Sequence, residues 1–261
     1  MDSSGFEPEA SPMPRERSSA DLRAQTIHYR ATENQYLQIK LMDKKHFKRR
    51  HRCNHPRMKK KELEMRLQQV PRINQPNPHL EQYMTPATIA SDIIFTAYQL
   101  DDIENKTILD LGCGTGIFAI GACLAGAKNV IGIDIDTSSI QTAKTYAQQQ
   151  NLDIEFLVKD INDVEIFCDT VLMNPPFGAQ KSNLQADRKF LEKAFQISQV
   201  IYSIHLKKTI PFIEKLATAL HGDITHQKDY DFPIKWMFSF HTKQTVSYEV
   251  TLVRIVTKHP L

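Results

Sequence analysis

The stretch TILDLGCGTGIF (107–118) decides the fold of this chain. Residues 107–111 form a short apolar run, which is typical of a buried strand. Residues 112–116 are rich in glycine, which permits a tight turn and a close approach of the backbone to a ligand. A helical pattern follows at 117–124. This order predicts the first unit of a parallel α/β sheet, although a glycine loop by itself is also found in dinucleotide-binding folds.

The rest of the chain continues this alternation. Further strands are expected at 129–133, 154–158, 170–173 and 200–204, and further helices at about 137–149, 188–199 and 207–220. Two strand-like runs, 234–240 and 246–256, are joined by a short polar turn and predict a β-hairpin. We therefore expect an α/β fold with a mostly parallel sheet, helices on both faces and an antiparallel C-terminal hairpin.

Two helices are expected before the glycine turn. Residues 59–70 place leucine and valine at helical spacing and predict a short amphipathic helix. Residues 71–80 contain three prolines and predict an extended loop. Thr85 and Pro86 then form the expected N-cap and first turn of a second helix.

Charge is distributed unevenly along the chain. Residues 1–61 hold 15 Lys and Arg against 7 Asp and Glu, a net of +8, whereas the remainder holds 18 against 23, a net of −5. The overall positive charge therefore does not argue for nucleic-acid binding by the folded body. We expect residues 1–57 to be a disordered or weakly ordered basic leader, followed by one domain at 58–261. The favoured interpretation is a solvated or non-native extension with Met58 as a candidate start, and the alternative is an RNA-binding tail.

The composition excludes several classes of protein. Shares of 41% apolar and 24% charged residues are ordinary for a globular chain. No run of 18 apolar residues indicates a membrane span, and no secretory signal is recognisable. The four cysteines form no CxxC pair and no zinc-ligand spacing, so no metal site is expected. Cysteines without a framework fit a reducing cytoplasm, which is the predicted location.

Three aspartates stand at the ends of three successive expected strands. Asp110 precedes the first glycine of the turn, Asp134 ends the second strand, and Asp160 ends the third. Ligands of open α/β sheets bind at the carboxyl ends of the strands. Asp110 could accept a hydrogen bond from an ammonium group or a water, Asp134 could bind a ribose diol, and Asp160 could bind an adenine amino group. Each acid alone could cap a helix, but the three together predict a cofactor site.

The sequence Asn174-Pro175-Pro176-Phe177 follows the expected fourth strand. An exocyclic amine such as adenine N6 is a poor nucleophile because its lone pair is delocalised into the ring. The side-chain oxygen of Asn174 and the backbone carbonyl of Pro175 can accept its two hydrogens, and consecutive prolines fix the backbone that carries this carbonyl. Phe177 offers a face for the base, and such stacking contributes about 1–3 kcal/mol. The alternative is a Pro-Pro turn beside a buried Phe.

With these motifs identified, residues 58–261 resemble the archaeal and eukaryotic small-subunit ribosomal-RNA adenine-N6 methyltransferases of the methyltransferase-like five type. The resemblance rests on KELEMRLQQV (61–70), LEQYMT (80–85), DLGCGTG (110–116), GIDID (132–136), MNPPFG (173–178) and YSIH (202–205). The pairing of LEQY with NPPF is specific, whereas the glycine loop alone is not. The resemblance implies a Rossmann-like seven-strand fold, with S-adenosylmethionine as the methyl donor and S-adenosylhomocysteine as its product.

The resemblance also implies roles for individual residues. Asn174 to Phe177 would hold the target base, with Asn174 near the cofactor as well. The implied or expected cofactor contacts are Gln82 and Thr85 from the N-terminal segment, Asp110, Gly112, Gly114, Thr115 and Ile117 from the glycine loop, Asp134 for the ribose, and Asp160 with Ile161 for the adenine. Thr115 stands where the eukaryotic pattern often has Cys, a change that a backbone contact tolerates.

Two partners are implied by the resemblance. One is small-subunit ribosomal RNA, and the other is a small zinc-binding activator protein that would pair with a sheet edge near 154–158. An RNA path could be lined by basic residues of the catalytic half, namely Lys181, Arg188, Lys189, Lys207, Lys208, His241 and Lys243. Each of these side chains could equally be a solvated surface charge.

Two other functions remain open on the sequence. An amide nitrogen presents a similar chemical problem, so glutamine-N5 methylation of a protein is one alternative. That class more often has Tyr than Phe in the fourth motif position and usually a preceding helical domain. The other alternative is a non-catalytic RNA-binding or ribosome-assembly module, which is disfavoured because suitable residues occupy the expected cofactor positions.

Overall fold

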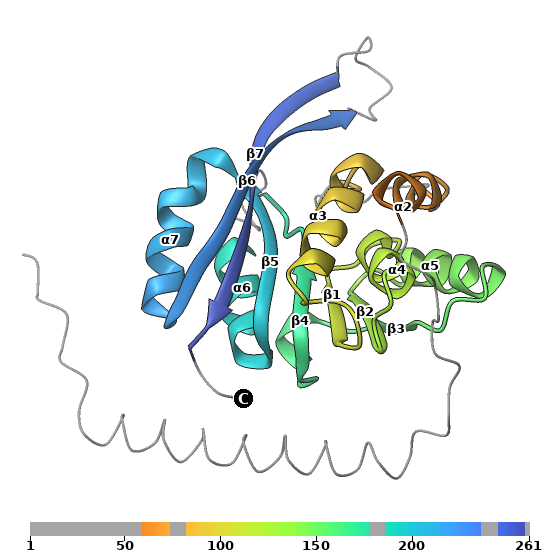
Figure 1. Ribbon diagram of the computed structural model, residues 1–261, viewed down its shortest axis with the longest axis horizontal. Coiled ribbons are helices and arrows are strands. Elements are labelled where there is room, and N and C mark those ends of the chain that lie inside the picture. The colour runs from red at the N-terminus through yellow and green to blue at the C-terminus, as the bar shows by residue number, and fades with distance from the viewer. Residues whose placement is uncertain (1–58, 74–81, 178–185, 236–244, 259–261) are drawn as a thin grey trace, which may run out of the picture. The chain divides into compact units, whose positions relative to one another are not determined.

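The computed structural model describes residues 59–73, 82–177, 186–235 and 245–258. Seven strands form one sheet with helices on both faces (Figure 1). The strands are β1 (Thr107–Leu111), β2 (Asn129–Asp134), β3 (Glu155–Val158), β4 (Cys168–Met173), β5 (Ser198–Leu206), β6 (Gly222–Lys235) and β7 (Thr245–Thr257). The α-helices are α2 (Lys60–Leu67), α3 (Ala87–Gln99), α4 (Ile117–Leu124), α5 (Thr137–Gln149), α6 (Ala186–Ile197) and α7 (Ile210–Ala219), with short 3-10 helices η2 (Ile161–Asp163) and η4 (Lys207–Thr209).

The strand order β3-β2-β1-β4-β5-β7-β6 places a topological switch between β1 and β4. Strands β1 to β5 are parallel, and β7 runs antiparallel to both of its neighbours. Leu111 of β1 is the register partner of Met173 of β4. The glycine turn and the NPPF sequence therefore begin side by side at the carboxyl edge of the sheet, where ligands of this fold class bind. The predicted Rossmann-like fold is confirmed.

An apolar core covers each face of the sheet. Helices α2, α3, α4 and α5 pack with Ile108 and Leu172 on one face, and α6 and α7 pack with Leu109 and Val171 on the other. Consecutive strand residues point to opposite faces, so the neighbours Ile108 and Leu109 enter different cores. Strands β1 and β4 are therefore buried on both sides, which explains why their sequences are mostly apolar.

Some predicted boundaries are wrong. Thr85 does not cap α3, because its hydroxyl accepts a hydrogen bond from the Asn174 side chain while Pro86 occupies the N-cap position. Helix α6 ends at Ile197, since Ser198 already starts β5. The predicted last helix divides into η4 and α7.

The first hairpin strand shows the largest difference from the prediction. It is β6, at 222–235, not 234–240, and residues 236–240 lie outside the described part of the chain. Strand β6 lies at the edge of the sheet and exposes polar side chains such as Asp223 and Thr225. Because many of its residues face solvent, it lacks the continuous apolar run that would predict a strand from the sequence.

The expected leader at 1–57 lies outside the described residues, so its order stays a prediction. Among the helices that the structure describes, none is long and apolar enough to cross a membrane.

A buried charge cluster joins the turn after α3 to the C-terminal strands. The Asp102 carboxylate accepts hydrogen bonds from the Tyr202 hydroxyl at 2.6 Å and from Nε and Nη2 of Arg254 at 2.8 and 3.0 Å. The Asp102 and Arg254 side chains are only 8% and 15% exposed. Removing one partner of such a pair leaves the other charge buried without compensation.

We expect Asp102→Ala to lower the free energy of unfolding by about 3–5 kcal/mol, because Arg254 loses its counter-charge and Tyr202 loses its acceptor. Urea denaturation measures the change. The matched control is Glu104→Ala at an exposed position nearby, which should stay within about 0.5 kcal/mol of wild type. Similar losses for the two variants would show that the cluster is not stabilising.

Candidate active site

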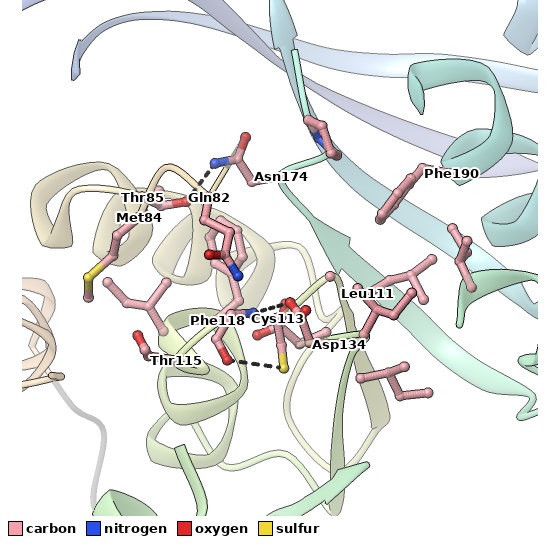
Figure 2. A pocket seen from close by; sticks show the side chains of 18 of the residues that line it. Gln82, Met84, Thr85, Leu111, Cys113, Thr115, Phe118, Asp134, Asn174 and Phe190 are labelled. Carbon is pink, nitrogen blue, oxygen red and sulfur yellow. Dashed lines mark hydrogen bonds between the residues drawn. The ribbon is translucent and has the colours of Figure 1, made fainter. Parts of the chain in front are cut away.

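A single pocket gathers the chemistry-bearing residues at the carboxyl ends of the strands (Figure 2). It lies between the segment before α3, the glycine turn and helix α6. The predicted site residues that line it are Gln82, Thr85, Asp110, Gly112, Gly114, Thr115, Ile117, Asp134, Asp160, Ile161, Asn174 and Pro176. Two other predicted residues, Pro175 and Phe177, are not among its lining residues.

The glycine turn folds back onto the end of β2. Gly112 has a φ of 73° and Gly114 a φ of 54°, both in the left-handed region that favours glycine. The backbone N–H groups of Gly112 and Cys113 donate to the carbonyl oxygen of Ile133 at 2.8 and 2.9 Å. The Gly114 N–H donates to the Asp134 carboxylate at 2.7 Å. The turn therefore presents its backbone to the pocket in a fixed shape.

The Asp134 carboxylate is held at the end of β2 but keeps binding capacity. One oxygen accepts from Gly114 and the other accepts from the Asp136 N–H at 2.9 Å. A carboxylate offers about four acceptor positions, so both oxygens can still accept from a ligand. Burial is the main cause that raises the pKa of Asp134, partly offset by these hydrogen bonds. The position suits a neutral hydroxyl donor such as a ribose.

Asp110 is a buried acid at the base of the pocket. It is 1% exposed and accepts a hydrogen bond from the Ala119 N–H of α4 at 2.9 Å. Burial raises the pKa of Asp110 to about 8, and the nearby Asp134 charge adds to the shift, while the Ala119 hydrogen bond opposes it. A nearby cation would stabilise the ionised form of this buried carboxyl, so the position suits a cationic ligand.

Asn174 is oriented by the segment before α3. Its Nδ2 donates to the Thr85 hydroxyl at 3.1 Å (Figure 2). Within the described chain its Oδ1 is buried and has no hydrogen-bond partner. An unpaired buried acceptor costs about 1–3 kcal/mol, a cost that a donor on a ligand would remove. The Thr85 contact thus leaves the amide oxygen as the acceptor that is free for a ligand.

Two further predicted residues make contacts within the protein. The Gln82 side chain donates to the Asp136 carboxylate at 3.0 Å, which ties the N-terminal segment to the loop after β2. Asp160 caps η2, where one of its oxygens accepts from both the backbone and the side chain of Asn162 at 2.8 Å. Helix capping is thus one role of this acid, and its other oxygen can still accept from an adenine amino group.

Phe177 belongs to a group of three rings beside the pocket. It stacks on Tyr83 with centroids 6.2 Å apart and makes a T-shaped contact with Phe232 of β6, with centroids 5.7 Å apart. Tyr83 lines the pocket, whereas Phe177 packs against the core behind it. That Phe177 offers a face to a base stays a prediction.

The sequence did not predict that Tyr83, Lys189 and Phe190 line the pocket, although Lys189 was expected along an RNA path. Tyr83 lies inside the quoted LEQYMT segment and could have been found from it. Lys189 and Phe190 come from α6, and no spacing relative to the glycine turn marks them. A methyl group placed on Gly112 would lie 3.0 Å from the Phe190 ring, so this ring covers the first glycine.

The basic residues expected along an RNA path separate into groups. Lys207 pairs with Asp229 at 3.0 Å, and Arg188 pairs with Glu192 at 2.7 Å, so both have acidic partners. Lys189 is exposed and lines the pocket. Three of the expected residues, Lys181, His241 and Lys243, lie outside the described residues.

Known proteins are similar to this chain in both sequence and fold. Residues 89–199 match the Methyltransferase small domain family. An uncharacterized protein of Methanocaldococcus jannaschii is 43% identical, covering 76% of this chain and 94% of its own length. The rRNA N(6)-adenosine-methyltransferase METTL5 of Danio rerio is 35% identical, covering 76% of this chain and 98% of its own length.

The crystal structure of a Pyrococcus horikoshii protein proposed to be an RNA methyltransferase superposes with a TM-score of 0.71. It is 37% identical and covers 77% of this chain and 98% of its own. Sequence and fold therefore agree along nearly the whole length of these relatives. The chain belongs to the METTL5-like family of methyltransferases, which have the class I S-adenosylmethionine-dependent fold.

Proposed function

We propose that this protein transfers a methyl group from S-adenosylmethionine to the N6 amine of an adenosine in small-subunit ribosomal RNA, through a domain at 58–261. The observation that carries the proposal is the unpaired, buried Oδ1 of Asn174 at the edge of the pocket. An exocyclic amine donates hydrogens, and this oxygen is an acceptor of the required kind. The METTL5 relatives are named as rRNA N(6)-adenosine-methyltransferases, which supports the choice of substrate.

S-adenosylmethionine is the cofactor of this family, and the pocket residues fit it. The buried carboxyl of Asp110 suits the ammonium end, and the acceptor positions left on Asp134 suit the ribose. Asp160 and Ile161 would face the adenine, while Gln82, Thr85 and the glycine turn would close the remaining sides. The bound cofactor supplies an electrophilic methyl group.

The protein's own contribution would be to orient the target amine. Asn174 Oδ1 and the Pro175 carbonyl would accept its two hydrogens and direct the nitrogen lone pair at the methyl carbon. On methylation the amine would lose one proton to solvent, and S-adenosylhomocysteine would leave as the product. Catalysis is mainly positioning, so small errors in the placement of Asn174 should be costly.

The same proposal includes a small zinc-binding activator protein as a partner. Strand β3 ends the sheet on one side, and Val158 at its end is 48% exposed. A free strand edge can accept a strand from another chain.

The decisive experiment is a tritiated-methyl transfer assay on small-subunit ribosomal RNA, with and without the activator protein. Wild type should label the RNA at an adenosine, and Asn174→Ala should lose at least about 100-fold in kcat, because the amine loses an acceptor and its alignment. S-adenosylhomocysteine binding by Asn174→Ala checks that the pocket survives. Labelling of a release-factor glutamine instead of RNA would contradict the proposed substrate.

Thr85 should act through the orientation of Asn174. Thr85→Val keeps the shape but removes the acceptor for Nδ2, so the amide can rotate and present its NH2 group to the base. We expect kcat to fall about tenfold or more, corresponding to about 1.4 kcal/mol or more. Thr85→Ser keeps a hydroxyl and is the matched control. Equal kcat values for the Val and Ser variants would exclude this role.

Cofactor affinity should rise with pH because of Asp110. Below pH 8 its carboxyl is largely protonated in the free protein, and a bound ammonium group favours the ionised form, so binding must release a proton. We expect S-adenosylhomocysteine affinity to rise by on the order of tenfold between pH 6 and 8. Calorimetry at several pH values measures this. Asp110→Asn should bind more weakly and with a flat profile, and an equal pH dependence in both proteins would rule out Asp110 as its source.

A further inference from the structure

Three side chains, two of them fully buried, form a hydrogen-bonded chain beside the pocket. The His205 Nδ1 lies 2.8 Å from the Asp187 carboxylate, and its Nε2 lies 2.7 Å from the Ser203 hydroxyl. His205 and Ser203 are fully buried, and the Asp187 side chain is 17% exposed. A carboxylate can only accept, so Nδ1 carries a hydrogen and Nε2 accepts from Ser203 in the neutral ring. Both ring nitrogens are satisfied, and the ring has one orientation.

This order of residues resembles a nucleophilic Ser-His-Asp arrangement, but its burial excludes that chemistry. Ser203 and His205 have no exposed surface, and neither lines the pocket. No substrate can reach the hydroxyl without unfolding β5. The chain of hydrogen bonds therefore orients parts of the protein and does not act on a substrate.

The parts that it joins are two walls of the pocket. Ser203 is the register partner of Met173, the residue directly before Asn174. Asp187 is the second residue of α6, in the turn that also carries Lys189 and Phe190 into the pocket. One wall is thus the end of β4, the other is the start of α6, and β5 connects them through His205.

Phe190 is the side chain that this connection would place. Asp187 and Phe190 are three residues apart on α6 and lie on neighbouring positions of its surface. The Phe190 ring covers Gly112, where an added methyl group would lie 3.0 and 3.3 Å from two ring carbons. A small movement of the first turn of α6 would therefore move the ring away from the glycine turn.

We infer that Asp187, His205 and Ser203 form a clasp that positions Phe190 over the glycine turn and thereby sets the affinity for the cofactor. Asp187 and His205 are positioning residues, because neither is among the residues that line the pocket. The inference rests on the cofactor pocket of the proposed function and is independent of the RNA target.

The test is a double-mutant cycle on S-adenosylhomocysteine binding, in which calorimetry measures the affinity of each variant. Asp187→Ala should weaken binding about tenfold, and Phe190→Ala should do the same. The double variant should bind about as weakly as Phe190→Ala alone, because Asp187 acts through that ring. Asp187→Asn keeps an acceptor for Nδ1 and should stay within about twofold of wild type. Glu192→Ala, on an exposed part of the same helix, is the matched control.

A merely structural role would give a different pattern. Asp187→Ala would then lower the melting temperature with unchanged affinity, or the two losses would multiply in the double variant, and either result overturns the inference. If Asp187→Ala does not fold, Ser203→Ala removes the bond to Nε2 and should weaken binding about threefold, on the scale of one lost hydrogen bond. Unchanged affinity in Ser203→Ala would then overturn it. If the binding results are as expected but the wild-type protein does not methylate RNA, only the proposed function is contradicted.

Discussion

The backbone of the glycine turn packs directly on the end of β2, where two N–H groups share the carbonyl oxygen of Ile133 and a third reaches Asp134. This contact requires that no side chain stands between the two elements. A methyl group on Gly132 would meet the Phe156 ring at 2.5 Å, and one on Gly116 would meet the same ring at 2.8 Å. The backbone therefore packs closely around the Phe156 ring. This packing sets the shape of the cofactor site and the position of acids such as Asp134.

How far the fold could be predicted depended on how each element is buried. The bounds of β1, α4 and α5 were predicted correctly, because a doubly buried strand, a fully buried apolar helix and a capped amphipathic helix each leave a strong pattern. Strand β6 was misplaced because many of its residues face solvent at the edge of the sheet. The C-terminal end of α6 was predicted incorrectly, because Ser198 starts β5 but its side chain is not typical of a strand.

Predicting the site followed a similar rule. Residues at strand ends, such as Asp110, Asp134 and Asn174, could be predicted to meet, because parallel strands bring their carboxyl ends together. The partner of Asn174 could not, because Thr85 lies 89 residues away in a segment whose local pattern indicates a helix cap. The place of Phe190 in the pocket could not be predicted for the same reason, since tertiary packing alone decides which turn of α6 faces the pocket.

Strand β7 lies between β5 and β6, although it follows both in the chain. Until β7 is made, β5 lacks its second neighbour and β6 has no strand to pair with. Phe232 of β6 then cannot be held against Phe177 of the NPPF sequence. During synthesis, strands β1 to β5 can assemble while the ring group of Tyr83, Phe177 and Phe232 is still incomplete. The enzyme should therefore become competent only late in translation, after its C-terminal strand has left the ribosome and entered the sheet.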